Sequence, residues 1–159
     1  MFEASLIVKV WIAQLKEMVE IDNELPSPEE YNALRKIAGW NFYDDKSASD
    51  GLEGALYTVS VRENGELVAF GRVVGDGRIT FYIQDVIVVS DKRGNGYARI
   101  IMEHIMDYLR GVAAPGAVVG LMSSKGVEDM YKKFGFIERP AEKNMGAGMT
   151  LPVDWNKRA

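Results

Sequence analysis

The run "ITFYIQDVIVVSDKRGNGYARIIMEHIMDYLRG", residues 79–111, joins a long apolar stretch, a glycine-rich turn and an amphipathic stretch in direct succession. The first part, Ile79 to Val89, is mostly apolar, which is typical of a central strand buried on both faces. The last part, Tyr97 to Arg110, has the helical period and is expected to end at Gly111. Its apolar face carries Ile101, Ile105, Tyr108 and Leu109. The run therefore predicts a strand, a turn and a helix.

The turn between these elements carries two glycines, Gly94 and Gly96. Glycine has no Cβ, so the backbone N–H groups of the turn stay open to an anion that approaches closely. The same groups lie at a helix N-terminus, where the helix dipole favours negative charge. We therefore expect a phosphate-binding turn. It is not a dinucleotide fingerprint, because Arg99 stands where G-x-G-x-x-G needs its third glycine, and it lacks the Lys-Ser/Thr of a P-loop.

The segment before the run predicts two further strands. Asn64-Gly65 and Asp76-Gly77 each supply the positive φ angles that hairpin turns demand, so the strands over residues 57–89 are expected to be antiparallel. Earlier in the chain, Ser27 as N-cap and Glu30 three residues later mark a helix start that follows a strand near Asp22. A polar loop with a short second helix is expected over residues 40–56.

In the segment after the run, predicted strands and a predicted helix alternate again. "AVVGLM" predicts a buried strand, "KGVEDMYKKF" a helix, and "GFIERP" with "GAGMTL" a final strand pair. The fold class is therefore α/β (α+β), with a mixed, mostly antiparallel central sheet of about six to seven strands and helices on both faces. No linker separates parts of the chain, so residues 1–159 are expected to form a single domain.

Composition bounds the function. The 159 residues carry a net charge of -4, which gives no global attraction to nucleic acid or to an anionic membrane, so any anion site must be local. There is no cysteine and one histidine, His104, which leaves little for a metal site, and we expect none. The apolar run "LIVKVWIAQL" is too short to span a bilayer and lacks a basic n-region. We expect a cytoplasmic protein, in which this segment could form an extra strand that pairs either within a subunit or between the subunits of a homodimer.

Two motifs carry a family resemblance. Arg93, Gly96 and Ala98 form R-x-x-G-x-A between a long strand and a helix, and "MYKKFGF", Met130 to Phe136, places a tyrosine on a helix that runs into Gly-Phe. Together they resemble the GNAT superfamily of acetyl-CoA-dependent N-acetyltransferases, over residues 15–151. The resemblance implies transfer of the acetyl group of acetyl-CoA to a primary amine, within a ternary complex. A small-molecule acceptor is expected rather than a protein amine.

The resemblance also implies how coenzyme A is held. The turn would bind the pyrophosphate, and the sheet would splay after the long strand so that the backbone of Val88 and Val89 pairs with pantetheine. Ser124 stands where many relatives carry an asparagine that contacts the cofactor, and its hydroxyl has a shorter reach. The expected cofactor-binding residues are Val88, Val89, Arg93, Gly94, Asn95, Gly96, Tyr97, Ala98 and Ser124.

Two residues are candidates for proton transfer. By resemblance, Tyr131 is the proton donor to the leaving thiolate, while backbone N–H of Val88 or Val89 polarises the carbonyl. Asp85 is the only carboxylate inside the long strand, and burial generally raises a carboxyl pKa toward the range of a base. Asp85 could equally be a hydrogen-bonded structural group, and many members of the family lack a dedicated base.

Four residues are candidates for binding the acceptor: Trp40, Tyr43, Asp44 and Gln84. In this fold the loop that carries the first three overhangs the acceptor side of the cleft, and aromatic rings beside carboxylates suit a cationic amine. Alternatively, Trp40 anchors the loop, Asp44 is solvated, and Gln84 satisfies a bulge.

Two other classes of protein stay open. One is a catalytically silent member that binds acetyl-CoA as a sensor or interaction module, and turnover with any amine would exclude it. The other is a Rossmann-type protein, which predicts a parallel sheet and affinity for NAD. The identity of the acceptor does not follow from the sequence, because loop shape sets it within this fold.

Overall fold

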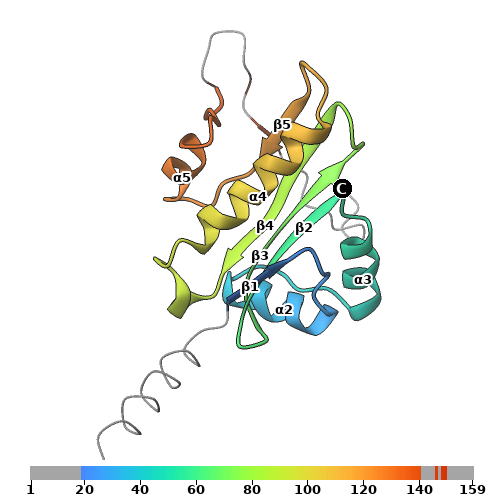
Figure 1. Ribbon diagram of the computed structural model, residues 1–159, viewed down its shortest axis with the longest axis vertical. Helices are drawn as coiled ribbons and strands as arrows, with labels where there is room; N and C mark the ends of the chain where they lie inside the picture. The colour runs from blue at the N-terminus through green and yellow to red at the C-terminus, as the bar shows by residue number, and fades with distance from the viewer. Residues whose placement is uncertain (1–18, 141–145, 147, 150–159) are drawn as a thin grey trace, which may run out of the picture. The chain divides into compact units, whose positions relative to one another are not determined.

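The computed structural model describes residues 19–140, 146, 148 and 149 (Figure 1). Five strands form one sheet: β1 (Val19–Asp22), β2 (Tyr57–Glu63), β3 (Glu66–Gly75), β4 (Thr80–Val88) and β5 (Val118–Leu121). The helices are α2 (Pro28–Ile37), α3 (Asp45–Glu53), the 3-10 turn η1 (Ser90–Lys92), α4 (Tyr97–Val112) and α5 (Glu128–Lys132). The apolar N-terminal run lies outside the described residues.

The strands lie in chain order, β1-β2-β3-β4-β5, and only the β4–β5 pair is parallel. Short connections join β2 to β3 and β3 to β4, and short connections give antiparallel neighbours, whereas α4 forms the crossover that parallel strands require. The prediction of a mixed, mostly antiparallel sheet is confirmed. The described residues contain five strands rather than six or seven.

Helices cover both faces of this sheet. A Cβ on Gly71 of β3 would lie 2.5 Å from Ile101 Cγ2, so α4 packs directly on that face. The neighbouring Phe70 points to the other face, where its ring meets Tyr31 of α2 edge-on at 6.1 Å. Alternate residues of a strand point to opposite faces, so this pair of contacts fixes which face α4 covers and which α2 covers. The prediction of helices on both faces is confirmed.

The two predicted hairpin turns form by different means. Asn64 and Gly65 both adopt positive φ, 52° and 82°, as the Asn-Gly pair predicts. In the second turn only Gly77 does so, at 79°, and the prediction of positive φ at Asp76 is wrong. The Asp76 carboxylate instead accepts the backbone N–H groups of three following residues: Arg78, Ile79 and Thr80. These bonds hold the turn and lower the Asp76 pKa.

Helix α2 begins as its sequence predicts. The Ser27 hydroxyl accepts the N–H of Glu30, and the Glu30 carboxylate accepts the N–H of Ser27, so a capping box is formed. Helix α4, by contrast, continues through Gly111 to Val112. Its expected end at Gly111 is therefore wrong, because tertiary packing of an apolar helix face outweighs the low helix propensity of one glycine.

The predicted strand at "GFIERP" is also wrong, because residues 136–140 form no strand. The Phe136 N–H instead donates back to the carbonyl of Tyr131, so the chain turns at the end of α5. Half of the strand expected to pair with it, "GAGMTL", lies outside the described residues, and Gly146, Gly148 and Met149 form no strand.

By compactness the chain divides into two units, residues 1–122 and 123–159. The sheet with α2, α3 and α4 belongs to the first unit, and α5 belongs to the second, so each is described by itself. The single domain over residues 1–159 stays a prediction. None of the helices in the described part of the chain is long and apolar enough to cross a membrane.

Candidate active site

The glycine turn lies where the sequence predicts it, between the end of β4 and the start of α4. Gly94 and Gly96 adopt φ of 87° and 86°, a left-handed conformation that strongly favours glycine. Nothing lies within 4 Å of a Cβ built on either residue, so the space beside the turn is open. Gly96 occupies the N-cap position of α4, and no side chain caps this helix. The turn therefore has the shape and polarity of an anion site.

A buried carboxylate that the sequence analysis missed ties down both ends of this turn. Glu63 on β2 accepts hydrogen bonds from the Lys92 ammonium, just before the turn, and from the Tyr97 hydroxyl, just after it. These partners hold the pKa of the Glu63 carboxyl below its usual value, Lys92 most strongly. The side chain of Tyr97 is thus directed into the protein, so only its backbone is placed to serve the turn.

The edge of β4 beyond Ile83 is open on one side. Strand β5 pairs with β4 only from Thr80 to Ile83, and among the described residues no strand continues that pairing toward Val88. On the β3 side, the N–H of Val89 donates to the carbonyl of Val68 at 2.9 Å. Because successive N–H groups of a strand point to opposite sides, that of Val88 points to the open edge. Of the two predicted backbone donors, Val88 is the one that remains available.

Asp85 lies at a bulge in β4. Phe70 pairs with Ile87 while Arg72 pairs with Gln84, so β4 has one residue more than β3 between these pairs. Asp85 adopts φ of 58° within the bulge. As a result Gln84 and Asp85 both reach the α2 face, where the Gln84 amide lies 3.4 Å from the Asp85 carboxylate. The alternative that Gln84 satisfies a bulge fits this geometry.

The Asp85 carboxylate is buried, with 0% of its side chain exposed, and both oxygens are bonded. Oδ1 accepts from Arg35 Nη1 at 2.7 Å, while Oδ2 accepts from Arg72 Nε and from the Tyr31 hydroxyl, each at 2.7 Å. Burial, followed by the charge of Asp85, raises the pKa of Tyr31 to about 12. This geometry fits the structural alternative for Asp85, and its action as a base stays a prediction.

The aromatic residues of the α2–α3 loop contact a cation that belongs to the protein. The Arg35 guanidinium carbon lies 4.8 Å from the ring centre of Tyr43 and 5.5 Å from that of Trp40. Trp40 also packs against the core cluster below α2 and α3, which fits the anchoring alternative. One face of each ring is therefore already taken by Arg35.

Asp44 is the N-cap of α3. Its carboxylate accepts the Ser47 backbone N–H at 3.0 Å and the Ser47 hydroxyl at 2.6 Å, and these bonds lower the Asp44 pKa. An aspartate directly before a polar helical segment could have revealed this cap, because aspartate is among the preferred N-cap residues. The predicted contact of Asp44 with an acceptor is not tested by this arrangement.

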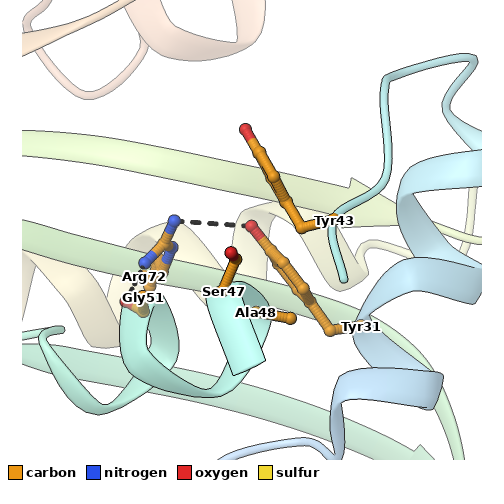
Figure 2. A pocket seen from close by; sticks show the side chains of 6 residues that line it. All are labelled: Tyr31, Tyr43, Ser47, Ala48, Gly51 and Arg72. Carbon is orange, nitrogen blue, oxygen red and sulfur yellow. Dashed lines mark hydrogen bonds between the residues drawn. The ribbon is translucent and has the colours of Figure 1, made fainter. Parts of the chain in front are cut away.

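A pocket of about 300 Å³ lies beside this network, on the face of the sheet that α2 and α3 cover (Figure 2). Six residues line it: Tyr31, Tyr43, Ser47, Ala48, Gly51 and Arg72. Figure 2 shows the Arg72 guanidinium and the Tyr31 hydroxyl directed toward each other across its floor. Of the four predicted acceptor residues, only Tyr43 lines the pocket.

The second unit holds the predicted proton donor. Tyr131 of α5 is buried, its ring meets Phe136 edge-on at 6.3 Å, and burial raises the pKa of its hydroxyl. Ser124 is exposed, and its carbonyl accepts from the Ser123 hydroxyl. The described residues contain no group of acidic or histidine side chains that could hold a metal ion.

Comparison with known proteins agrees with this architecture. The chain matches the family described as Acetyltransferase (GNAT) family over residues 15–136. It is 27% identical over 115 residues to the uncharacterized N-acetyltransferase ycf52 of Pyropia yezoensis, a match covering 70% of this chain but only 65% of that relative. It is also 33% identical over 76 residues to serotonin N-acetyltransferase 2, chloroplastic, of Oryza sativa subsp. japonica, covering 48% and 37% of the two chains.

A solved structure extends the match to three dimensions. SA2161 from meticillin-resistant Staphylococcus aureus, described as a probable acetyltransferase, superposes with a TM-score of 0.78 at 36% identity. The match covers 86% of this chain and all of SA2161. The open turn before α4, the open edge of β4 and these likenesses lead to one conclusion: the chain belongs to the GNAT family of acetyltransferases.

Proposed function

We propose that this chain transfers the acetyl group of acetyl-CoA to the primary amine of a small molecule, by direct attack of the amine in a ternary complex. The observation that carries the proposal is the open glycine turn at the N-terminus of α4. Membership of the family supports acetyl transfer, and two relatives named as N-acetyltransferases support nitrogen as the acceptor atom.

The residues of the first unit fit coenzyme A in two ways. The N–H groups around Gly94 and Gly96 would hold the pyrophosphate, since the turn is exposed and α4 has no side-chain cap. The Val88 carbonyl, on the open edge of β4, would accept an amide N–H of pantetheine in the manner of an added strand, which leaves the Val88 N–H for the reacting carbonyl. The family resemblance is what proposes Ser124 as a further coenzyme A contact, and its side chain belongs to an exposed residue.

Acetyl-CoA would supply the acetyl group as a thioester. A carbon–nitrogen bond forms as the carbon–sulfur bond breaks, so the amine must lose a proton and the thiolate must gain one. The Val88 N–H would donate to the carbonyl oxygen as negative charge develops there. The Tyr131 hydroxyl, which is protonated at neutral pH as in any tyrosine, would protonate the thiolate.

We assign the proton of the amine to solvent rather than to Asp85. Both Asp85 oxygens already accept hydrogen bonds from Arg35, Arg72 and Tyr31, and none of the side chain is exposed. A base must reach the proton that it takes, directly or through one water. Asp85 would then hold the strand bulge and the pocket wall instead of reacting.

Calorimetric titration with acetyl-CoA, and separately with NAD, tests the cofactor. We expect binding of acetyl-CoA alone, and loss of that binding in Gly96→Glu, whose side chain would fill the open space and add negative charge. Gly65→Glu is a matched control, because Gly65 has a similar φ of 82° and equally open surroundings in the β2–β3 turn. Acetyl-CoA binding that survives Gly96→Glu would show that this turn is not the phosphate site.

The alternative function is that of a catalytically silent acetyl-CoA sensor. It is favoured by the burial of Asp85, whose carboxylate is not accessible to act as a base. The two functions differ in turnover. Release of the coenzyme A thiol, measured across polyamines, amino sugars, arylalkylamines and amino acids, would be expected for the enzyme. Tight binding of acetyl-CoA with no thiol released by any amine would leave the sensor as the function.

A further inference from the structure

The pocket between α2, α3 and β3 has an unbalanced positive charge in its wall. Two guanidinium groups, those of Arg35 and Arg72, share the single carboxylate of Asp85, and all three side chains are largely buried. Buried charges in proteins are normally paired. The network therefore has one cation more than it has anions.

Arg72 presents this charge to the pocket. Its Nε donates to Asp85, Nη1 to the Gly51 carbonyl, and Nη2 to the Tyr31 hydroxyl at 3.4 Å. A guanidinium has five N–H donors, so two of them have no partner among the described residues. Arg72 lines the pocket, and 14% of its side chain is exposed there (Figure 2).

The pocket has no carboxylate to receive an ammonium group. Asp85 has no exposed side-chain surface, and Asp44 caps α3 through Ser47 and does not line the pocket. Among the polar side chains on the wall, the others are hydroxyls, of which that of Tyr43 could donate to an anion, and the Gly51 carbonyl already accepts from Arg72. One face of each aromatic ring expected to hold a cation is already in contact with Arg35.

We propose that the acceptor carries an anionic oxygen group, a carboxylate or a phosphate, that binds Arg72 in this pocket while its amine is acetylated. The acceptor class is then an amino acid or an amino phosphate rather than a simple alkylamine or polyamine. The inference rests on the proposed acetyl transfer, and it replaces the expectation of a site built for a cation. Guanidinium is well suited to the task, because its planar fork matches both oxyanions.

The position of the pocket also bears on acceptor length. Arg72 pairs with Gln84 and Ala69 pairs with Val88, so three residues of β3 separate the two positions, which is about 10 Å at roughly 3.3 Å per residue. The Arg72 side chain spans part of this distance. We therefore expect an acceptor in which several bonds separate the anionic group from the amine, and a preference that depends on chain length.

Matched pairs of acceptors test the inference on the wild-type chain. β-Alanine, γ-aminobutyrate and ε-aminocaproate are compared with ethylamine, propylamine and pentylamine, which lack only the carboxylate. O-Phosphoethanolamine is compared with ethanolamine to distinguish phosphate from carboxylate. We expect kcat/KM to be higher by about tenfold or more for the anionic member of at least one pair, as charge-assisted hydrogen bonds would give. Equal or faster turnover of every partner that lacks the anionic group would overturn the inference while leaving acetyl transfer intact.

Binding of the products keeps the inference testable even if no amine is turned over. N-Acetyl-ε-aminocaproate and N-pentylacetamide are titrated into the protein by calorimetry. Preference for the carboxylate-bearing product would support the anion site, whereas no difference would overturn it. Absence of turnover by itself would count against the proposed function alone.

Variants of the pocket residues test where the anionic group of the acceptor binds. Arg72→Lys keeps the charge but loses the fork, and Arg72→Gln loses both, so the preference for anionic acceptors should fall in that order. Arg110→Gln, at an exposed guanidinium near the end of α4, is the matched control and should retain the preference. Far-ultraviolet circular dichroism and acetyl-CoA affinity show whether the Arg72 variants are folded. If they are not, Tyr43→Phe, which removes only a hydroxyl, should reduce the preference, and an unchanged preference in this variant would contradict the site.

Discussion

Tyr131 is the residue whose contribution can be separated most simply from binding. A phenol with a raised pKa can donate a proton to a thiolate but contributes little to the affinity for coenzyme A. We expect Tyr131→Phe to lower kcat by about 10²- to 10⁴-fold, the usual range for general acid–base catalysis, with acetyl-CoA affinity nearly unchanged. Steady-state kinetics and calorimetry on the same preparation measure both quantities.

The control for this substitution is Tyr108→Phe, which removes a hydroxyl from a half-buried tyrosine of α4 stacked on Tyr57. Its kcat should stay close to that of the wild type. Equal losses of kcat and of acetyl-CoA affinity in Tyr131→Phe would indicate that Tyr131 holds the fold of its unit rather than donating the proton.

Asp85, in contrast to Tyr131, is expected to contribute to the stability of the protein through its buried charge. Asp85→Asn would leave Arg35 and Arg72 without their counter-ion in a buried setting, and breaking such a pair typically destabilises a protein by about 3–5 kcal/mol. We expect a loss of this size in the free energy of unfolding, measured with urea. A fully stable Asp85→Asn protein that has lost turnover and the acidic limb of its pH–rate profile would instead identify Asp85 as the base.

At the scale of elements, Glu63 joins β2 to both ends of the phosphate-binding turn. Because Lys92 and Tyr97 depress the pKa of Glu63 in the folded state, the carboxylate stabilises the fold at pH values above its unfolded pKa. That stabilisation is lost as the pH falls through the folded pKa. We therefore expect the wild type to exceed Glu63→Gln in stability near neutral pH and the two to converge well below pH 4, given an ordinary glutamate pKa of about 4.3.

Denaturation at a series of pH values measures this difference, and Glu66→Gln, at an exposed position on β3, is the control. A gap between wild type and Glu63→Gln that stays constant down to acid pH would show that the glutamine change acts through packing rather than through charge.

The sequence predicted correctly those elements that depend on residues close together in the chain. The capping box of Ser27 and Glu30, the Asn64-Gly65 hairpin and the glycine turn each depend on residues within six positions of one another, so the sequence was enough. The strand expected at residues 136–140 failed because a strand exists only through a partner, and the N–H of Phe136 donates to the carbonyl of Tyr131 in α5 instead.

The candidate site shows the same division. The turn and the β4 edge follow from motif and topology, whereas the pocket depends on contacts between distant positions, such as Arg35 with Asp85 or Arg72 with Gly51. No single residue in the sequence indicates these pairings, since an arginine in a helix is usually exposed. For this reason Asp44 was expected to face a cation, while the cation beside the aromatic rings is Arg35 itself.

For the whole molecule, the net charge of -4 opposes the approach of a polyanionic cofactor. Charges around the turn are nearly balanced: Lys92 pairs with Glu63, Arg99 pairs with Glu103, and Asp91 lies beside Arg93. Attraction at the turn then comes mainly from backbone N–H dipoles, which act at short range and are little affected by salt, whereas long-range repulsion is screened within a Debye length of about 8 Å at physiological ionic strength.

The association rate constant for acetyl-CoA should therefore rise with added salt, up to a plateau near physiological ionic strength. Stopped-flow measurements from about 0.01 M to 0.15 M NaCl test this, with S-acetylpantetheine as the control ligand. That ligand lacks the pyrophosphate and the ribose phosphate, so its rate should change little over the same range. A rate for acetyl-CoA that falls steeply with salt would mean that unpaired basic side chains steer the cofactor. The neutral turn would then bind the cofactor only after it has arrived.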